Sequence, residues 1–223
     1  MIDIPWDFTV IPSYFPRFYG AAWLTLQITV LGILLGLVLG LITALMRISR
    51  SKIIQGPALF YIWIIRGTPL LLQLFIIYFG LVEFVDIPRL TSAVIGLGVH
   101  NGAYMAEIFR GAIQSIDRGQ KEAAYSLGMT KTKAMRRIIL PQAFKRSVPP
   151  LGNQFIIALK DSSLASAVSV RELLLTARQI GSSTMMMLEM FVVVGVYYLL
   201  MTSVLTVLVG KLEKRLKVSD RRS

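Results

Sequence analysis

The sequence predicts an all-α membrane protein, a single transmembrane domain over 1–223 with five transmembrane helices. Two observations set this class: the mean hydropathy is +0.65, and only 16% of the residues are charged, well below the quarter or so that is usual in soluble domains. A membrane-spanning helix needs about 20 mainly apolar residues. Five segments meet this requirement, at about 21–46, 53–82, 90–113, 148–168 and 185–210.

The first two segments differ in the regularity of the helix that they predict. Residues 21–46 contain no charged side chain, as expected of an uninterrupted span. The second segment contains Pro57 near its start and Arg66, Gly67 and Pro69 near its middle. Proline cannot donate the backbone hydrogen bond that a helix interior needs, and glycine tolerates unusual backbone angles. We therefore expect the second helix to unwind locally and to expose backbone groups in a water-filled cavity.

The other three segments carry a few charged residues. The third contains Glu107 and Arg110 toward its cytoplasmic end, the fourth contains Lys160 and Asp161, and the fifth contains Glu189 near its outer end. A charge deep in a bilayer is costly and tends to mark a transport pathway. The charged residues nearest the middle of a span are therefore candidate functional residues.

The distribution of Lys and Arg predicts the orientation of the chain. Of the 24 basic residues, three lie at 47–52, nine at 110–146 and six from 211 onward, whereas only four lie in the loops on the other side. Because basic loops stay cytoplasmic, we expect the N-terminus outside and the C-terminus in the cytoplasm. The net charge of +12 then reflects topology, and no nucleic-acid partner is expected.

Small residues recur at a spacing of four on the first and third segments. This spacing places them on one helix face, where they allow two backbones to approach closely. We assign them to helix packing. They are Gly32, Gly36 and Gly40 on the first segment, and Gly98, Gly102 and Ala106 on the third.

A polar, strongly patterned loop lies between the third and fourth segments, at about 117–145. Its central part reads "QKEAAYSLGMTKTKAMRRIILP" and predicts two short helices. Gly128 is a natural left-handed stop for the first helix, and Thr130 can cap a second helix that ends before Pro141. From periodicity alone, this loop either lies on anionic lipid headgroups or docks to a protein.

The same loop resembles the permease subunit of bacterial ABC importers for polar amino acids. Members of that family carry Glu-Ala-Ala, three residues, Gly, nine residues, Ile, one residue and Leu-Pro in a cytoplasmic loop. This chain has Glu122-Ala123-Ala124, then Gly128, Ile138 and Leu140-Pro141 at the matching spacing. The stretches "IRGTPLLLQ" (65–73) and "NGAYMAEIFRGAIQSIDRGQ" (101–120) also resemble the amino-acid branch, so the resemblance covers nearly the whole chain.

The resemblance implies that the loop is a coupling helix that inserts into a separate ATP-binding cassette ATPase. The residues expected at this contact are Glu122, Ala123, Ala124, Gly128 and Met129. The chain has no GxxxxGK[ST] phosphate loop, and its nearest stretch, "GMTKTK", lacks the spacing. We therefore expect this chain not to be an enzyme and to hold no cofactor, with ATP and Mg bound by the partner ATPase.

Other partners follow from the same interpretation. Five spans are few for enclosing a pathway, so we expect a second copy of the permease, or a homologue, to face this chain across a twofold axis. The resemblance also implies an extracytoplasmic amino-acid-binding protein. Membrane lipid is the remaining partner, because the expected location is the inner, or cytoplasmic, cell membrane.

Polar residues from three segments are expected at similar depth in the membrane. An amino acid needs donors for its carboxylate and acceptors for its ammonium, and such a set supplies both. The candidate substrate-binding residues are Arg66, Thr68, Asn101, Tyr104, Glu107, Lys160, Asp161, Ser162 and Ser163. Alternatively these charges pair among themselves, since Glu107 and Arg110 are three residues apart on one helix face. No metal site is expected, because the chain has no cysteine and a single histidine, His100.

The function predicted from these features is import of a polar L-amino acid, basic ones included, driven by a partner ATPase. One alternative is an ion-coupled secondary amino-acid transporter or channel that needs no ATPase. A membrane-surface signalling or assembly protein is a further alternative, but it leaves the charges inside the spans unexplained.

Overall fold

The computed structural model describes residues 6–81 and 87–220, and these residues form helices and turns with no strand among them. The predicted all-α class is confirmed for this part of the chain. The elements are η1 (Phe8–Val10), α1 (Ile11–Tyr14), η2 (Phe15–Phe18), α2 (Tyr19–Arg47), α3 (Lys52–Arg66), α4 (Leu70–Leu81), α5 (Arg89–Gln114), α6 (Arg118–Ser126), α7 (Lys131–Ala134), η3 (Met135–Ile139), α8 (Leu140–Asp161), η4 (Ser162–Val168), α9 (Leu173–Thr184) and α10 (Met187–Asp220).

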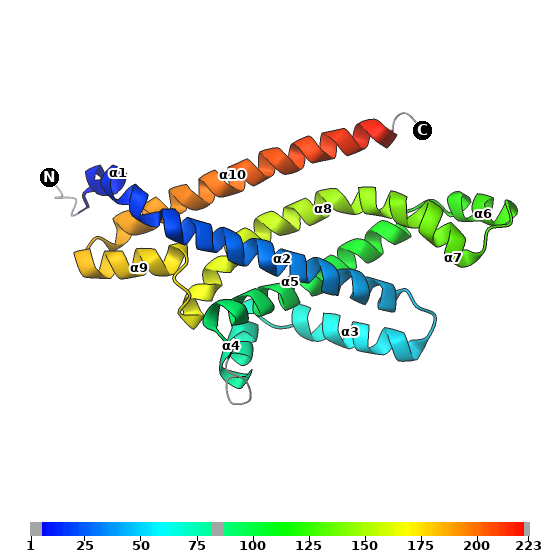
Figure 1. Ribbon diagram of the computed structural model, residues 1–223, viewed down its shortest axis with the longest axis horizontal. Helices are drawn as coiled ribbons and strands as arrows, with labels where there is room; N and C mark the ends of the chain where they lie inside the picture. The colour runs from blue at the N-terminus through cyan, green and yellow to red at the C-terminus, as the bar shows by residue number, and fades with distance from the viewer. Residues whose placement is uncertain (1–5, 82–86, 221–223) are drawn as a thin grey trace.

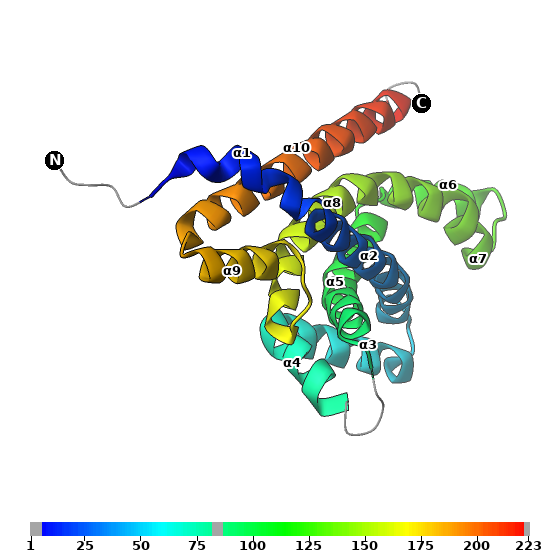
Figure 2. The same cartoon turned by 60° about the vertical axis from the view of Figure 1, so that its left-hand side comes forward.

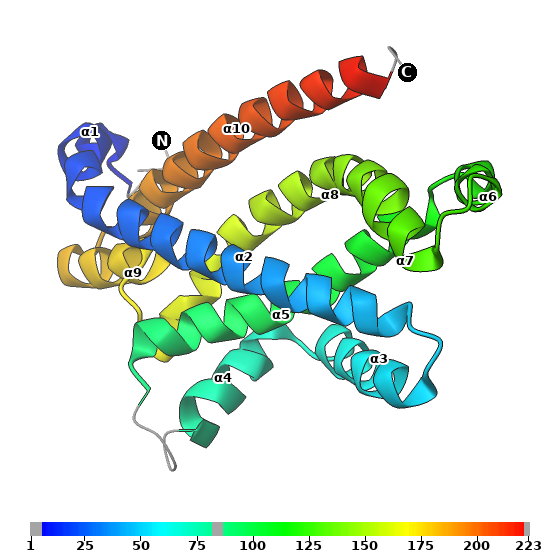
Figure 3. The same ribbon diagram turned by 45° about the vertical axis from the view of Figure 1, so that its right-hand side comes forward.

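The long helices α2, α5, α8 and α10 extend along the molecule, and the short helices α6 and α7 lie at one end of it (Figure 1). The C-terminal end of α10 lies at the same end, whereas the N-terminus and α9 lie at the opposite end (Figures 1 and 2). Toward its C-terminal end α10 diverges from the other long helices (Figure 3). The two termini therefore lie at opposite ends of the long axis.

Two helical runs in the described ranges are long and apolar enough to cross a membrane, Phe8–Arg47 and Met187–Leu216. The pair α3 and α4 makes a third if it is taken as one span, bent by 106°. Much of α5 is buried and its buried face carries small and polar residues, so it is less apolar than a lipid-facing helix. The predicted total of five spans, and which side each terminus faces, stay predictions.

The packing of α2 against α5 confirms the role predicted for the small residues. A Cβ atom added to Gly36 would lie 3.2 Å from the Asn101 Cβ and 3.3 Å from the Gly98 carbonyl oxygen. One added to Gly40 would lie 2.7 Å from the Met105 Cβ. No side chain fits between these backbones, so glycine sets the distance between the two helices.

The helix break predicted in the second segment is present between α3 and α4. Gly67 caps the C-terminus of α3, and α4 begins at Leu70, after Thr68 and Pro69. Pro57 is tolerated inside α3. The break turns the chain by 106°, so a single straight helix over 53–82 is not formed.

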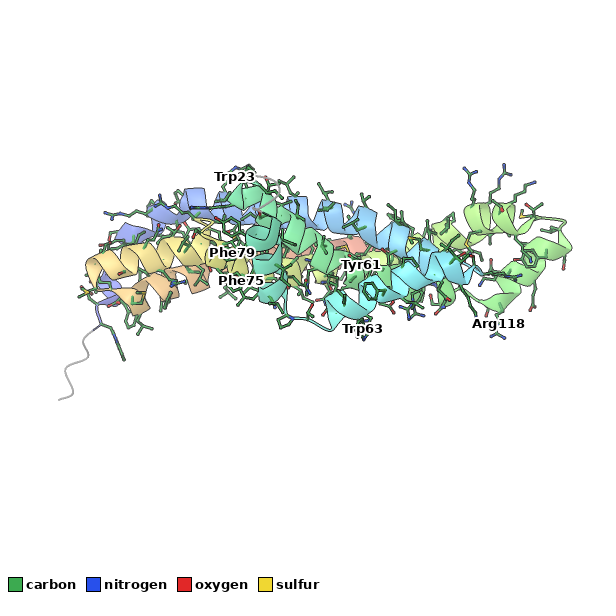
Figure 4. All side chains as sticks on the ribbon, turned by 90° about the horizontal axis from the view of Figure 1, so that it is seen from below. Trp23, Tyr61, Trp63, Phe75, Phe79 and Arg118 are labelled. Atoms are coloured by element: carbon green, nitrogen blue, oxygen red, sulfur yellow. The ribbon has the colours of Figure 1, made fainter. Side chains whose placement is uncertain are left out.

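Apolar clusters fill the space between the helices, and large aromatic side chains cover the outside. One cluster joins α4, α5 and η4 through residues such as Leu74, Leu97 and Val168. Trp23 and Trp63 are exposed and lie at opposite edges of the molecule in Figure 4. Exposed apolar side chains of this size are expected of a surface that meets lipid.

Replacing Gly40 with Ala tests the α2 and α5 packing. The new methyl group would force the two helices apart, and we expect a loss of about 1–3 kcal/mol in the free energy of unfolding. Gly195→Ala on α10 is the matched control, since nothing lies within 4 Å of a Cβ atom there. Thermal unfolding of the detergent-solubilised chain checks the prediction, and equal unfolding temperatures for the two variants would contradict it.

Candidate functional site

Gln73 occupies the centre of the break between α3 and α4. Its side chain is only 6% exposed, and its Nε2 donates to the carbonyl oxygens of Ile65 (2.8 Å) and Thr68 (3.0 Å) and to Thr68 Oγ1 (2.8 Å). Thr68 Oγ1 in turn donates to the Ile64 carbonyl oxygen (2.8 Å). Three carbonyl groups at the break, those of Ile64, Ile65 and Thr68, therefore accept hydrogen bonds from side chains of the protein.

The sequence analysis did not select Gln73. It is uncharged and lies in an apolar helix, so a search for intramembrane charges passes over it. A polar side chain four residues after the proline of a predicted break was the signal that could have identified it, because broken helices leave carbonyl groups that need donors.

A chain of polar contacts continues from Gln73 to α5. The His100 Nδ1 lies 3.0 Å from the Gln73 Oε1, and the His100 and Tyr104 ring centroids are 5.0 Å apart. The Arg66 guanidinium carbon lies 5.2 Å from the centroid of the Tyr104 ring, within range of a cation–π interaction. Three predicted site residues, Arg66, Thr68 and Tyr104, are thus brought together around two residues that were not predicted.

Asn101 connects α5 to α8. It is fully buried, its Nδ2 donates to the Leu97 carbonyl oxygen (2.8 Å) and its Oδ1 accepts from Gln154 Nε2 (2.8 Å). Both ends of the Asn101 amide therefore have protein partners in this structure, and the side chain holds two helices together.

Glu107 is the centre of a charge cluster at the loop end of α5. Its Oε2 accepts from Arg110 Nη2 (2.9 Å) and Nε (3.2 Å), and its other oxygen pairs with Arg47 of α2. The alternative that intramembrane charges pair among themselves is confirmed for Glu107 and Arg110. The additional pairing with Arg47 was not predicted, because that residue was counted only as a cytoplasmic loop charge.

The remaining candidates lie where α8 ends and η4 begins. Lys160 is exposed and Asp161 is half-buried, while the Ser162 and Ser163 hydroxyls donate to the Leu159 and Lys160 carbonyl oxygens (2.7 Å each). Within the described residues, no hydrogen bond or ion pair joins this group to Arg66 or Tyr104. The two groups are connected instead by apolar packing, because η4 contacts α4 and α5 through a shared cluster.

The loop helices α6 and α7 largely follow the predicted pattern. Gly128 has a φ of +74° and ends the first helix, and Thr130 Oγ1 accepts from the Lys133 amide (3.3 Å) as the cap of α7. On α6, Glu122 and Ala123 are exposed whereas Ala124 is buried. Met129, also predicted at the contact, is half-buried.

The expectation that the second loop helix ends before Pro141 is wrong. Helical backbone continues from α7 through the π-helical turn η3 into α8. In this wider turn the Leu140 amide bonds to the Met135 carbonyl oxygen, and Pro141 lies in the first turn of α8. A proline is tolerated there because the π-helical turn already interrupts the regular bonding between residues four apart just before it.

Side-chain contacts attach the loop to α8. Arg146 donates to the Ser115 carbonyl oxygen and to Ser115 Oγ (3.2 Å) just before α6 begins. Gln142 Nε2 donates to Gln120 Oε1 (3.2 Å) on α6. A displacement of α6 would therefore be transmitted to α8, the helix whose other end carries Lys160 and Asp161.

The outer surface of the loop exposes both apolar and charged side chains. Leu127, at the end of α6, is 79% exposed and Tyr125 is also exposed, next to the exposed Glu122 and Ala123. Arg118, at the start of α6, points outward from the same end of the molecule in Figure 4. No group of acidic or histidine side chains that could hold a metal occurs in residues 6–81 and 87–220.

Comparison with known proteins places these features in one family. Residues 36–218 match the family described as binding-protein-dependent transport system inner membrane component. The chain is 41% identical over 215 residues to the L-cystine transport system permease protein TcyB of Bacillus subtilis (strain 168), covering 96% of this chain and 92% of that protein. It is 40% identical over 215 residues to the glutamine transport system permease protein GlnP of Escherichia coli (strain K12), covering 95% and 98%.

A solved structure has the same fold. The crystal structure of an amino acid ABC transporter with histidines contains a chain that is 42% identical to this one, with a TM-score of 0.89. The match covers 94% of this chain and 98% of that chain. The chain that contains the broken helix pair α3 and α4 and the loop helices α6 and α7 is therefore similar in sequence and fold to a chain of a solved amino acid ABC transporter.

Proposed function

Because the chain belongs to the family of binding-protein-dependent transport system inner membrane components, we propose that it is the membrane-spanning subunit of an ATP-driven importer for a polar L-amino acid. The observation that carries this proposal is the loop at α6 and α7. It holds the Glu-Ala-Ala…Gly pattern, and it presents Glu122, Ala123 and Leu127 to the outside at one end of the molecule.

A separate ATP-binding cassette ATPase is the partner that fits this loop. The small Ala123 side chain allows close approach, Glu122 offers a charge for a salt bridge, and Leu127 offers an apolar contact. ATP and Mg bind to that partner, since this chain carries no phosphate loop. The connections from Arg146 and Gln142 to the loop then carry a movement of the ATPase into α8.

The loop end of the molecule faces the cytoplasm in this proposal. The basic residues at 47–52, those of the α6 and α7 loop and those at the end of α10 belong to the same end of the molecule (Figure 1). Concentration of Lys and Arg on one side is the pattern of cytoplasmic loops. The N-terminus and α9 then face outward, with five crossings of the inner membrane between the termini.

A second permease chain and a binding protein complete the assembly. Arg66 and Lys160 are exposed in the isolated chain, and an exposed charge within a membrane needs a pathway or a partner chain beside it. We therefore place a second permease across these residues. An extracytoplasmic binding protein delivers the amino acid at the α9 end.

The chemistry of the site fits the charged ends of an amino acid better than a cationic side chain. Arg66 and Lys160 can bind a carboxylate, and Asp161 can bind an ammonium. Glu107 is paired with Arg47 and Arg110, so it does not offer a free carboxylate to a basic substrate. TcyB and GlnP, at about 40% identity, are named for different amino acids, so the proposal covers polar amino acids as a class.

Uptake measurements test the transport function. Uptake of labelled L-glutamine or L-arginine is measured in proteoliposomes that contain this chain with its co-purified partners. It is expected to require ATP on the side of the membrane where the ATPase lies, and to continue after ionophores collapse the ion gradients. Uptake that follows the ion gradient without ATP would instead favour the secondary transporter.

Glu107→Gln is expected to leave the ratio of arginine to glutamine uptake within about twofold, because the Glu107 charge is already neutralised within the protein.

The absence of cysteine from the chain allows a direct test of orientation. A single cysteine at the exposed Ser183, in α9, is expected to react with a membrane-impermeant maleimide in intact cells. A single cysteine at the exposed Ser126, in α6, is expected to react only after the membrane is permeabilised. The reverse pattern would contradict the proposed orientation.

A further inference from the structure

His100 is the one histidine of the chain, and the function proposed above gives it no role. It lies on α5 opposite the break between α3 and α4, with 9% of its surface exposed. Its two nearest polar or aromatic partners are Gln73 and Tyr104. The chemical state of its ring follows from these contacts.

The orientation of the Gln73 amide is determined by its partners. The carbonyl oxygens of Ile65 and Thr68 can only accept hydrogen bonds, so the amide NH₂ of Gln73 must face them. Its Oε1 is then directed to His100, 3.0 Å from Nδ1. An amide oxygen also only accepts, so the His100 Nδ1 must carry the proton.

This tautomer leaves the second ring nitrogen free to accept. In a neutral imidazole with a protonated Nδ1, the Nε2 holds a lone pair and no proton. One ring carbon separates the two nitrogens, so the Nε2 lone pair diverges from the Nδ1–H bond and does not point at the Gln73 Oε1. His100 thus supplies one hydrogen-bond acceptor on α5, the helix that faces the break between α3 and α4.

A cation flanks the same place. The Arg66 guanidinium carbon lies 5.2 Å from the centroid of the Tyr104 ring, and the centroid of the His100 ring lies 5.0 Å from that of Tyr104. Arg66 is exposed and Tyr104 is half-buried. A donor fork that matches a carboxylate and an acceptor that matches an ammonium therefore both lie beside the Tyr104 ring.

We propose that His100 is a specificity-determining residue, whose Nε2 accepts a hydrogen bond from the α-ammonium of the transported amino acid while Arg66 binds the α-carboxylate. Gln73 is the positioning residue that holds the ring in the accepting tautomer. The inference rests on the proposed import of amino acids and identifies which end of the substrate Arg66 and His100 each recognise. It also explains why a buried glutamine and a histidine meet at the break of a membrane helix.

The experiment pairs each amino acid with its desamino analogue. Competitive binding to the purified complex of this chain with its ATPase, without the binding protein, uses L-glutamine against desamino-glutamine and L-arginine against desamino-arginine. In the native complex the desamino compound is expected to bind at least about tenfold more weakly, since it lacks the ammonium that Nε2 would accept. In His100→Asn the two compounds are expected to bind equally, because the Asn amide can replace Nδ1 but not Nε2.

Two further variants separate recognition from folding. His100→Gln places an amide near the Nε2 position and is expected to keep part of the preference for the amino acid. His100→Ala, which replaces His100→Asn if that variant does not fold, is expected to lose the preference. Gln55→Leu is the matched control: Gln55 Nε2 donates to the Arg47 carbonyl oxygen eight residues away (3.1 Å), the same separation as Gln73 and Ile65. It is expected to leave the preference unchanged.

The outcomes distinguish this inference from the function on which it rests. If His100→Asn or His100→Ala weakens binding of both compounds but keeps their ratio, His100 has only a structural role and the inference is overturned while import stands. If the native complex binds neither amino acid and its uptake needs no ATP, the proposed function fails and the inference fails with it. If the native complex prefers each amino acid to its desamino analogue, and His100→Asn or His100→Ala loses this preference while Gln55→Leu keeps it, the inference and the proposed function are both supported.

Discussion

A backbone carbonyl or amide inside hydrocarbon must find its hydrogen-bond partner within the protein, and the break between α3 and α4 is where this constraint acts most directly. Gln73 supplies the donors for the carbonyl groups of Ile65 and Thr68. The same side chain contacts His100 of α5, so the residue that satisfies the carbonyl groups of the break also orients the ring that we propose binds the substrate. The bend of 106° can therefore persist in a membrane, and it places Arg66 over Tyr104.

The connection between the α6 loop and the polar residues around Lys160 depends on α8. At the loop end it is attached to the segment that contains α6 through Arg146 and Gln142. In its middle, Gln154 binds Asn101 of α5, and at its far end the helix leads into Lys160 and η4. A π-helical turn directly precedes this helix, and Pro141 lies in its first turn without a break in the helical backbone. One continuous element thus connects the loop proposed to bind an ATPase with the polar residues proposed to bind a substrate.

Features encoded within one helix were predictable from the sequence, and features that depend on a neighbouring helix were not. The glycine faces of α2 and α5, the break at Pro69, the left-handed Gly128 and the Thr130 cap follow from local spacing and backbone chemistry. The pairing of Arg47 with Glu107 and that of Gln73 with His100 join residues far apart in the chain, which periodicity cannot bring together. The continuation through Pro141 was missed because the π-helical turn has no simple sequence signal.

The most direct test of the central claim is whether the loop binds an ATPase. The chain would be purified from its native membranes in mild detergent, beside Gly128→Asn and Gly128→Val, and all co-purifying proteins would be identified. Asparagine tolerates the positive φ of this position whereas valine does not. We predict that a protein with a phosphate loop accompanies the native chain and Gly128→Asn but is lost from correctly inserted Gly128→Val. Absence of an ATPase from the native sample, or equal recovery with Gly128→Val, would contradict the account.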